Sequence, residues 1–321
     1  MPQWLYEQLS QTVDHPQLDF AFQGTVNWMR ALAILVDNVD FEDANQRAFY
    51  VHVLPRGPIN SEADVFACER ILLAMHNLAA LRAFGGIEHK YDVVRSAIIA
   101  WYYCIYFSAQ VMISVASGAA PETHAKTDKV WYSDIVKQRL VVRPFDLYLN
   151  SLISRDVDSE IMRIRGGNTY DLMNYPQNIE EALGCIYSYL NGTASYEREQ
   201  MEHNIMQGKE FKKLGVKNFR TKGARQLRDA WLAKGEVNFL TQAFRYRGKA
   251  NYRDSIYLSY GQDQSLRIEQ FVSDLTSVGE KFLRMTCFYV KRRIAVNSWN
   301  EFVNDLNNNG RITIPLNLAL I

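Results

Sequence analysis

Apolar residues recur at steps of three and four along most of the chain, which is the period of an α-helix. The longest such pattern lies near the C-terminus and keeps this alternation for three heptads. It predicts one helix of about 25–30 residues, roughly 40 Å long, which is more typical of a helical bundle than of a free coiled coil. Its apolar positions are Ile268, Phe271, Leu275, Val278, Phe282, Met285 and Tyr289.

Two further helices are indicated by their start and stop signals. Ser61 with Asp64 resembles a capping box, and the helix that follows is expected to run to about Ala83, before Gly85-Gly86. Asn178 with Glu181 opens another helix, which we expect Gly192 to close. The apolar face predicted for the first helix consists of Val65, Cys68, Leu72, Met75 and Ala79.

A third helical segment carries no charge from Ser96 to Pro121, a length that could span a membrane. Its middle, however, contains an amide and several aromatic side chains with polar tips, which prefer water or the membrane interface. We therefore expect no membrane association, but a central buried helix from about Tyr91 to Ser117. The residues predicted to be buried in it are Trp101, Tyr103, Ile105 and Val111.

These patterns predict an all-α fold, a helical bundle that forms a single helical domain over 1–321. The core helices are expected in 62–118 and 236–292, with 122–235 as a long helical insertion. Strand signals are few. The short β-branched runs 140–142 and 312–314 could form at most a minor β ribbon.

The last residues, 311–321, form an apolar tail. An exposed apolar tail promotes aggregation, so we expect it to pack on the body of the protein or on a partner.

Composition places the chain among ordinary soluble proteins. It is 48% hydrophobic and 22% charged, which excludes a disordered, collagen-like or disulfide-scaffold protein. The four cysteines form no C-x-x-C pair and lie among apolar residues, so we expect buried, reduced thiols. Because 1–18 lacks the basic and apolar regions of a secretory signal, a cytoplasmic protein is expected.

Charge is distributed unevenly. The whole chain carries only +1, whereas 209–228 alone carries +7, so the remainder is near −6. Gly208, just before this basic segment, and Gly215 and Gly223 within it make it loop-like. Phe211 and Phe219 interleave with the cations, as in surfaces that bind phosphates and stack bases. It predicts contact with RNA or another polyanion; docking on an acidic protein partner is the alternative. The candidate nucleic-acid-binding residues are Lys212, Lys213, Lys217, Arg220, Lys222 and Arg225.

Motifs for metals and nucleotides are absent. The sequence has no G-x-x-x-x-G-K-[ST], no H-E-x-x-H and no paired Cys/His set, so no cofactor and no metal site are expected. Four Arg-x4–6-His matches exist, against about 1.3 expected by chance. They are Arg47/His52, Arg70/His76, Arg82/His89 and Arg198/His203, and only Arg198 is followed by a polar residue.

Two patches of the sequence resemble the HEPN family of helical domains. Arg95 precedes the paired Tyr102-Tyr103, then Phe107 and Ala109, as in the second helix of that family. Further on, Arg-Gly-Lys-Ala-Asn-Tyr, starting at Arg247, is similar to its later Arg-x-x-Ala-Asp/Asn-Tyr signature.

The resemblance implies a bundle of four or five helices. Many HEPN proteins are RNases of toxin–antitoxin, CRISPR-associated or phage-defence systems, whereas others are non-catalytic subunits. In the RNases an Arg and a His cleave RNA without metal: the His acts as acid or base, and the Arg stabilises charge on the phosphate.

This sequence departs from the family pattern, because Tyr252 stands where a histidine would follow Arg247. Tyrosine, with a pKa near 10, is a poor base at neutral pH. If the protein is catalytic, the histidine comes from elsewhere: His124, which holds a place like that of the histidine common between the two patches, or second His203. Arg247 is the candidate arginine.

Three functions stay open. The first is a HEPN-like, nucleic-acid-associated protein of a prokaryotic defence or toxin system, with metal-independent RNase activity. The second is a non-catalytic HEPN-like subunit that binds a protein encoded nearby, with a homo-oligomer also open. The third is an unrelated helical protein with a small-molecule pocket lined by Trp101, Tyr102, Tyr103 and Tyr106.

Overall fold

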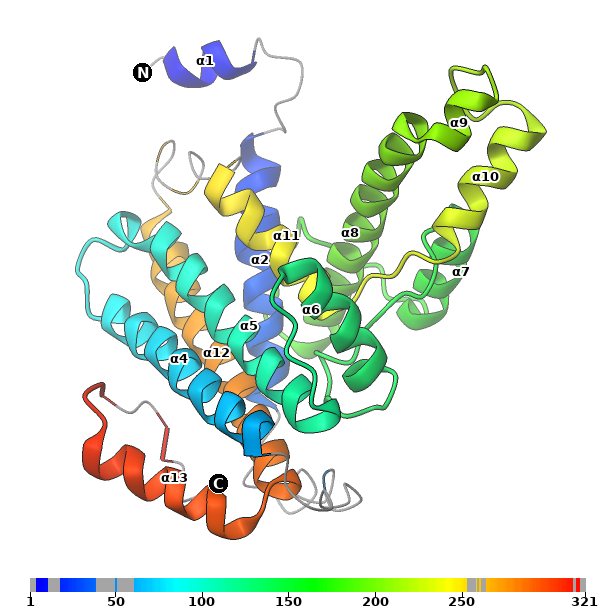
Figure 1. The fold of residues 1–321 in the computed structure, drawn as a ribbon. Helices are drawn as coiled ribbons and strands as arrows, with labels where there is room; N and C mark the ends of the chain where they lie inside the picture. Colours follow the sequence, from blue (N-terminus) through cyan, green and yellow to red (C-terminus); the bar gives the residue numbers. More distant parts are fainter. Residues whose placement is uncertain are drawn as a thin grey trace.

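The computed structural model describes residues 4–10, 18–38, 50, 61–252, 258, 260, 264–313 and 316–317. Within these residues every regular element is a helix, as predicted. A bundle of long helices lies side by side and forms what we call the body (Figure 1). Its helices are α2 (Leu18–Asp37), α4 (Ser61–Gly85), α5 (Val94–Ser117), α11 (Phe239–Tyr252) and α12 (Ser265–Arg293).

Most of the remaining helices pack on this bundle or on one another, whereas α1 is drawn apart from it (Figure 1). α8 packs against α2 at its N-terminal end and then runs away from the body (Figure 1). Its far part, together with α9 and α10, forms a projection, residues 198–232, that we call the arm. These outer helices are α1 (Trp4–Ser10), α6 (His124–Trp131), α7 (Ser154–Arg165), α8 (Ile179–Gln207), α9 (Lys209–Lys213), α10 (Lys222–Leu232) and α13 (Val296–Asn309).

Helix α5, which carries no charge after Arg95, is the centre of the body and packs against α4, α6, α11 and α12. Among the described residues it is the one helix long and apolar enough to span a membrane, and 83% of its apolar stretch is buried inside the fold. Trp101 is fully buried and makes edge-to-face contacts with Trp28 and Tyr246. Ile105 and Val111 are buried as predicted, whereas Tyr103 is only half-buried.

Helix α12 confirms the heptad pattern. It is 29 residues long, and all seven predicted apolar positions are buried. The start signal at Asn178 is confirmed as well: Asn178 Oδ1 accepts from the Glu181 amide at 3.0 Å, and Glu181 Oε2 accepts from the Gln177 amide at 2.8 Å. The first bond satisfies an amide that the first turn of the helix leaves open, and the second holds the residue before the cap.

Two helix predictions were wrong in detail. Gly192 does not end α8, which continues to Gln207, because contacts to other helices outweigh the helix-breaking tendency of one glycine, about 1 kcal/mol. In α4 the buried face is turned: Val65 and Leu72 are exposed. Small residues let the neighbouring helices approach on the other side, which buries Ala67, Ile71, Ala74, Met75, Leu78 and Leu81.

The expected β ribbon is absent from the described residues, and Ile314 lies outside them. An antiparallel bridge, Leu149–Val237, lies at the base of the arm instead. There Gly235 lies so close to Leu152 that a Cβ would meet that side chain's Cδ1. Of the apolar tail, Leu316 is buried, while 314–315 and 318–321 lie outside the described residues.

Candidate functional site

His124 is the first residue of α6, and the local sequence places it there. Thr123 is the N-cap, whose hydroxyl accepts from the Lys126 amide at 3.2 Å. The imidazole then lies among aromatic side chains of α5 and α11, with its ring 4.5 Å from Tyr106 and 5.4 Å from Phe244. Its Nδ1 is 2.8 Å from the hydroxyl of Tyr102.

Arg247 approaches the same aromatic wall from α11. Its guanidinium carbon lies 5.1 Å from the Tyr102 ring centre and 5.4 Å from that of Phe244, both within cation–π range. Its Nε is buried and has no hydrogen-bond partner among the described residues. The structure thus places Arg247 and His124 against the same two rings, those of Tyr102 and Phe244, although 123 positions of sequence separate them.

Electrostatics keep this histidine neutral. Burial lowers the pKa of His124, and the nearby Arg247 charge lowers it further. Burial also raises the pKa of Tyr102, so its hydroxyl stays protonated at neutral pH. In the tautomer with the proton on Nδ1, His124 donates to the Tyr102 oxygen and Nε2 is free to accept a proton.

One turn further along α6, Asp128 fastens this helix to α11. Both of its carboxylate oxygens accept from the Thr241 hydroxyl, at 3.1 and 3.0 Å. Burial raises the pKa of Asp128 to about 6, and burial together with the Asp128 charge raises that of Glu236 to about 7. This contact holds the His124 helix against the Arg247 helix.

The two sequence patches that resemble HEPN domains also meet. Arg95 of α5 donates through Nη2 to the backbone carbonyl of Asn251 at the end of α11, at 3.2 Å. The side chain of Tyr252 lies outside the described residues.

The other arginine–histidine pairs are not at this site. His203 is exposed on the arm, and its neighbour Arg198 donates to Ser154 Oγ at 2.7 Å. His76 and His89 are exposed, and Arg82 pairs with Glu280 at 2.7 Å. Arg47 and His52 lie outside the described residues.

The aromatic side chains of α5 form a wall, and none of them lines either pocket described below. Trp101 points into the core, while Tyr102 and Tyr106 stack with 5.9 Å between their ring centres. Sequence reasoning named His124 and Arg247 but missed the role of Phe244, for which the only signal was its place one turn before Arg247 on α11.

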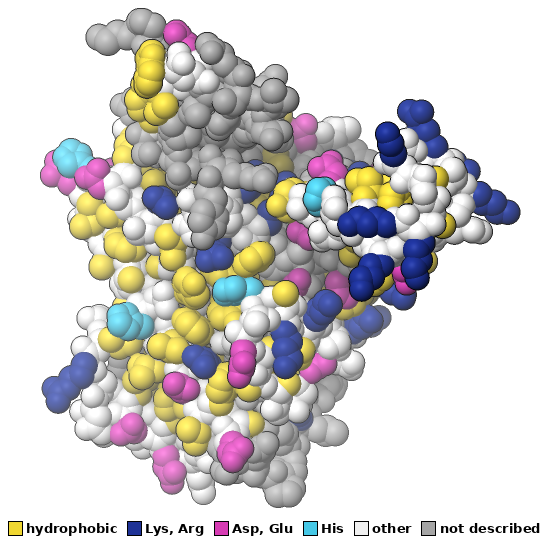
Figure 2. Space-filling model, turned by 45° about the horizontal axis from the view of Figure 1, so that its top comes forward, with side chains coloured by type: hydrophobic (Ala, Val, Ile, Leu, Met, Phe, Trp, Pro, Cys, Tyr) yellow, Lys and Arg dark blue, Asp and Glu magenta, His cyan; other side chains and the backbone are white. Residues whose placement is uncertain are grey.

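The predicted basic segment forms the tip of the arm. Figure 2 shows Lys and Arg side chains gathered there. The segment is not a simple loop: α9 and the start of α10 take up most of it. All six candidate nucleic-acid-binding residues are exposed: Lys212, Lys213, Lys217, Arg220, Lys222 and Arg225.

We expected the two phenylalanines of the segment to face solvent, but neither is exposed. Phe211 is buried and Phe219 half-buried, with their ring centres 5.0 Å apart. They form a small core of the arm with Ile205 and Ala224, because a short helical hairpin needs apolar contacts of its own. Base stacking on Phe211 is therefore excluded.

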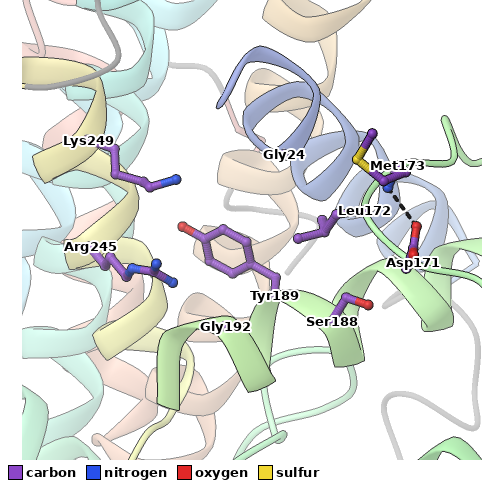
Figure 3. A pocket seen from close by; sticks show the side chains of 9 residues that line it. All are labelled: Gly24, Asp171, Leu172, Met173, Ser188, Tyr189, Gly192, Arg245 and Lys249. Atoms are coloured by element: carbon purple, nitrogen blue, oxygen red, sulfur yellow. Dashed lines mark hydrogen bonds between the residues drawn. The ribbon is translucent and has the colours of Figure 1, made fainter. Parts of the chain in front are cut away.

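A separate pocket of about 220 Å³ lies on the opposite side of α11, against α8, α2 and the 171–173 loop (Figure 3). Arg245 and Lys249 approach it from α11, and Tyr189 stands in its middle. Arg245 is held in place, since it donates to Thr193 Oγ1 at 3.0 Å and lies over the Tyr196 ring. Helix α11 thus presents Arg247 to one side and Arg245 to the other.

No group of three or more His, Cys, Asp or Glu side chains within the described part of the chain is arranged to hold a metal ion. The four cysteines are free thiols; Cys68 is half-buried and the other three are buried. No protein family, no curated protein and no solved structure matches this chain.

Proposed function

We propose that this protein binds RNA and cleaves it without a metal ion, with His124 as the base and Arg247 as the phosphate-stabilising cation. The observation that carries the proposal is that both side chains lie against Tyr102 and Phe244. A neutral imidazole and a guanidinium on the same aromatic side chains supply the base and the cation that 2′-hydroxyl attack needs.

In the proposed step, His124 Nε2 takes the proton of a ribose 2′-hydroxyl. The 2′-oxygen forms a bond to the adjacent phosphorus, and the bond from phosphorus to the 5′-oxygen breaks. The leaving 5′-oxygen takes a proton from water, and the remaining hydroxide takes the proton from His124 Nε2. The base is thereby restored, and the products are a 2′,3′-cyclic phosphate and a 5′-hydroxyl. Arg247 stabilises the extra negative charge on the phosphoryl oxygens.

The exposed cations of the arm support the substrate class. Six of them surround one end of the molecule, and such a surface binds phosphate chains without reading sequence. The HEPN resemblance is part of the same proposal: it favours a cytoplasmic RNase of a prokaryotic defence or toxin system.

The test is an RNA-cleavage assay in EDTA that compares the wild-type protein with Arg247→Ala, His124→Ala and His203→Ala. We expect the first two variants to lose about 10²–10⁴-fold in rate, as is usual when an acid–base or a charge-stabilising group is removed. His203→Ala is the matched control and should cleave like wild type, because His203 does not lie at the Tyr102–Phe244 site. Equal cleavage by all four proteins would assign the activity to a contaminant and contradict the proposal.

A non-catalytic HEPN-like subunit that binds a neighbouring protein is the second candidate. The exposed apolar side chains Val65 and Leu72, two turns apart on α4, favour it. Co-expression with products of adjacent genes tests it: a stable complex that Val65→Ser/Leu72→Ser disrupts, in a protein that does not cleave RNA, would support this function.

A further inference from the structure

The arm carries an apolar groove beside its basic surface. Its volume is about 440 Å³, and it lies between the end of α8, the start of α9 and α10. Met201, Leu227 and Trp231 supply its apolar walls, and Asn204 and Glu210 stand among its polar lining residues. Figure 2 shows hydrophobic side chains on the arm with Lys and Arg around them.

The groove exists because the apolar face of α10 is only partly covered. Ala224, Leu227 and Trp231 share this face: Ala224 is buried in the arm's core and Leu227 packs against it, whereas Leu227 and Trp231, one turn apart, also line the groove. The indole of Trp231 is 49% exposed, although Trp is normally among the more buried side chains. Lys234 lies over the same ring, 5.7 Å from its centre.

Charge decides what fits this groove. A ligand must bring flat apolar surface to Trp231 and negative charge to the cations around it. Single-stranded RNA carries both: bases stack on aromatic side chains while phosphates pair with Lys and Arg. The Asn204 amide and the Glu210 carboxylate add hydrogen-bonding groups of the kind that read base edges.

We propose that this groove is a binding site for one unpaired base of single-stranded RNA, stacked on Trp231, while the backbone phosphates contact the surrounding cations. The proposal rests on the proposed function and assigns its substrate class, single-stranded rather than double-stranded RNA. A base inside a duplex is paired and stacked, so it cannot reach the groove.

Tryptophan fluorescence tests the groove directly. Of the six tryptophans, Trp28, Trp101, Trp131 and Trp299 are at most 2% exposed, which leaves Trp4 and Trp231 accessible. In a Trp4→Phe background, Trp231 therefore dominates the emission that solvent and ligand can quench. The probe is a short 2′-O-methyl oligouridine, which the proposed nuclease cannot cleave, because its 2′-oxygen carries no proton.

We expect the oligouridine to quench this emission and an abasic chain of equal length to leave it unchanged. Trp231→Ala should weaken oligouridine binding about 5- to 150-fold, the range for loss of one stacked base. Trp231→Phe, which keeps an aromatic ring, should restore most of the affinity, and the abasic chain should bind all variants equally. Because Trp231 is half exposed, these variants are expected to stay folded, which circular dichroism checks.

Two results would overturn the proposal. If oligouridine binds Trp231→Ala as tightly as wild type, the arm contacts phosphates only, and the groove belongs to a protein partner. If no RNA binds even at low salt, the proposed function fails with it. The cleavage assay with Arg247→Ala and His124→Ala tests the candidate catalytic site instead of the groove. A failure of the groove proposal alone can therefore be distinguished from a failure of the proposed function.

Discussion

The body and the arm differ in the size of their hydrophobic cores. The body buries large aromatic residues completely, among them Trp28, Trp101 and Phe282. The arm has a core of Ile205, Phe211 and Ala224 with a few half-buried neighbours. Its surface is instead strongly basic, since 209–228 carries +7 whereas the whole chain carries +1. A large core makes the body a rigid support for the candidate site, and the arm offers a charged surface at the cost of its own stability.

The largest expected effect distinguishes these two cores. Trp101→Ala should lower the free energy of unfolding by about 3–5 kcal/mol, because it removes a fully buried aromatic side chain and leaves a cavity. Phe211→Ala should cost the whole protein less than about 1 kcal/mol, since the arm can open before the body does. Urea unfolding measures the first quantity, and amide hydrogen exchange in 198–232 shows the local opening in the second.

Two results would contradict this comparison. A loss below about 0.5 kcal/mol for Trp101→Ala, the range of surface substitutions, would mean that α5 is not the centre of the core. An equal loss for both variants would show that arm and body unfold as one unit.

A second prediction concerns the charge of the arm. Changing Lys212, Lys213, Lys217 and Arg220 to Ala should weaken RNA binding for every sequence tested. If each cation neutralises one phosphate, the salt slope for single strands should become shallower by about 2.8. Fluorescence anisotropy titrations from low to high salt measure it. Thermal stability should be unchanged, because all four side chains are exposed.

The smallest expected effect is a pKa shift in the body. Burial lowers the pKa of His124 and the Arg247 charge lowers it further, so Arg247→Gln should raise that pKa toward the ordinary histidine value. Arg245→Gln, on the other side of the same helix, is the matched control and should leave it unchanged. NMR titration of the His124 ring protons measures both; equal shifts would show that Arg247 does not act on this histidine.

The lowered pKa of His124 also makes the free energy of unfolding depend on pH. In the folded state His124 takes up its proton at lower pH than in the unfolded state, so the unfolded chain binds more protons as pH falls through about 6.5. His124 therefore contributes stability above that pH and loses it below. His124→Gln should reduce the fall in unfolding free energy between neutral pH and the folded pKa, which urea unfolding at several pH values would show.

The sequence by itself determined the helices, because their signals are local. The heptad of α12, the Asn178–Glu181 cap and the apolar α5 each depend on residues within a few turns of one another. The exposed cations of the arm were also predictable, since an isolated charge rarely leaves water. Arg247 and His124 were named from the resemblance, but no local pattern placed them together.

Tertiary structure decided which side of each element is buried. Val65 and Leu72 of α4 look apolar in sequence, yet neighbouring helices pack on the side that carries Ala67 and Ala74. Phe211 was expected at the surface and became the core of the arm, which left Trp231 to line the groove. The physical reason is that burial depends on surface contributed by distant segments, and so does the approach of Arg247 to His124.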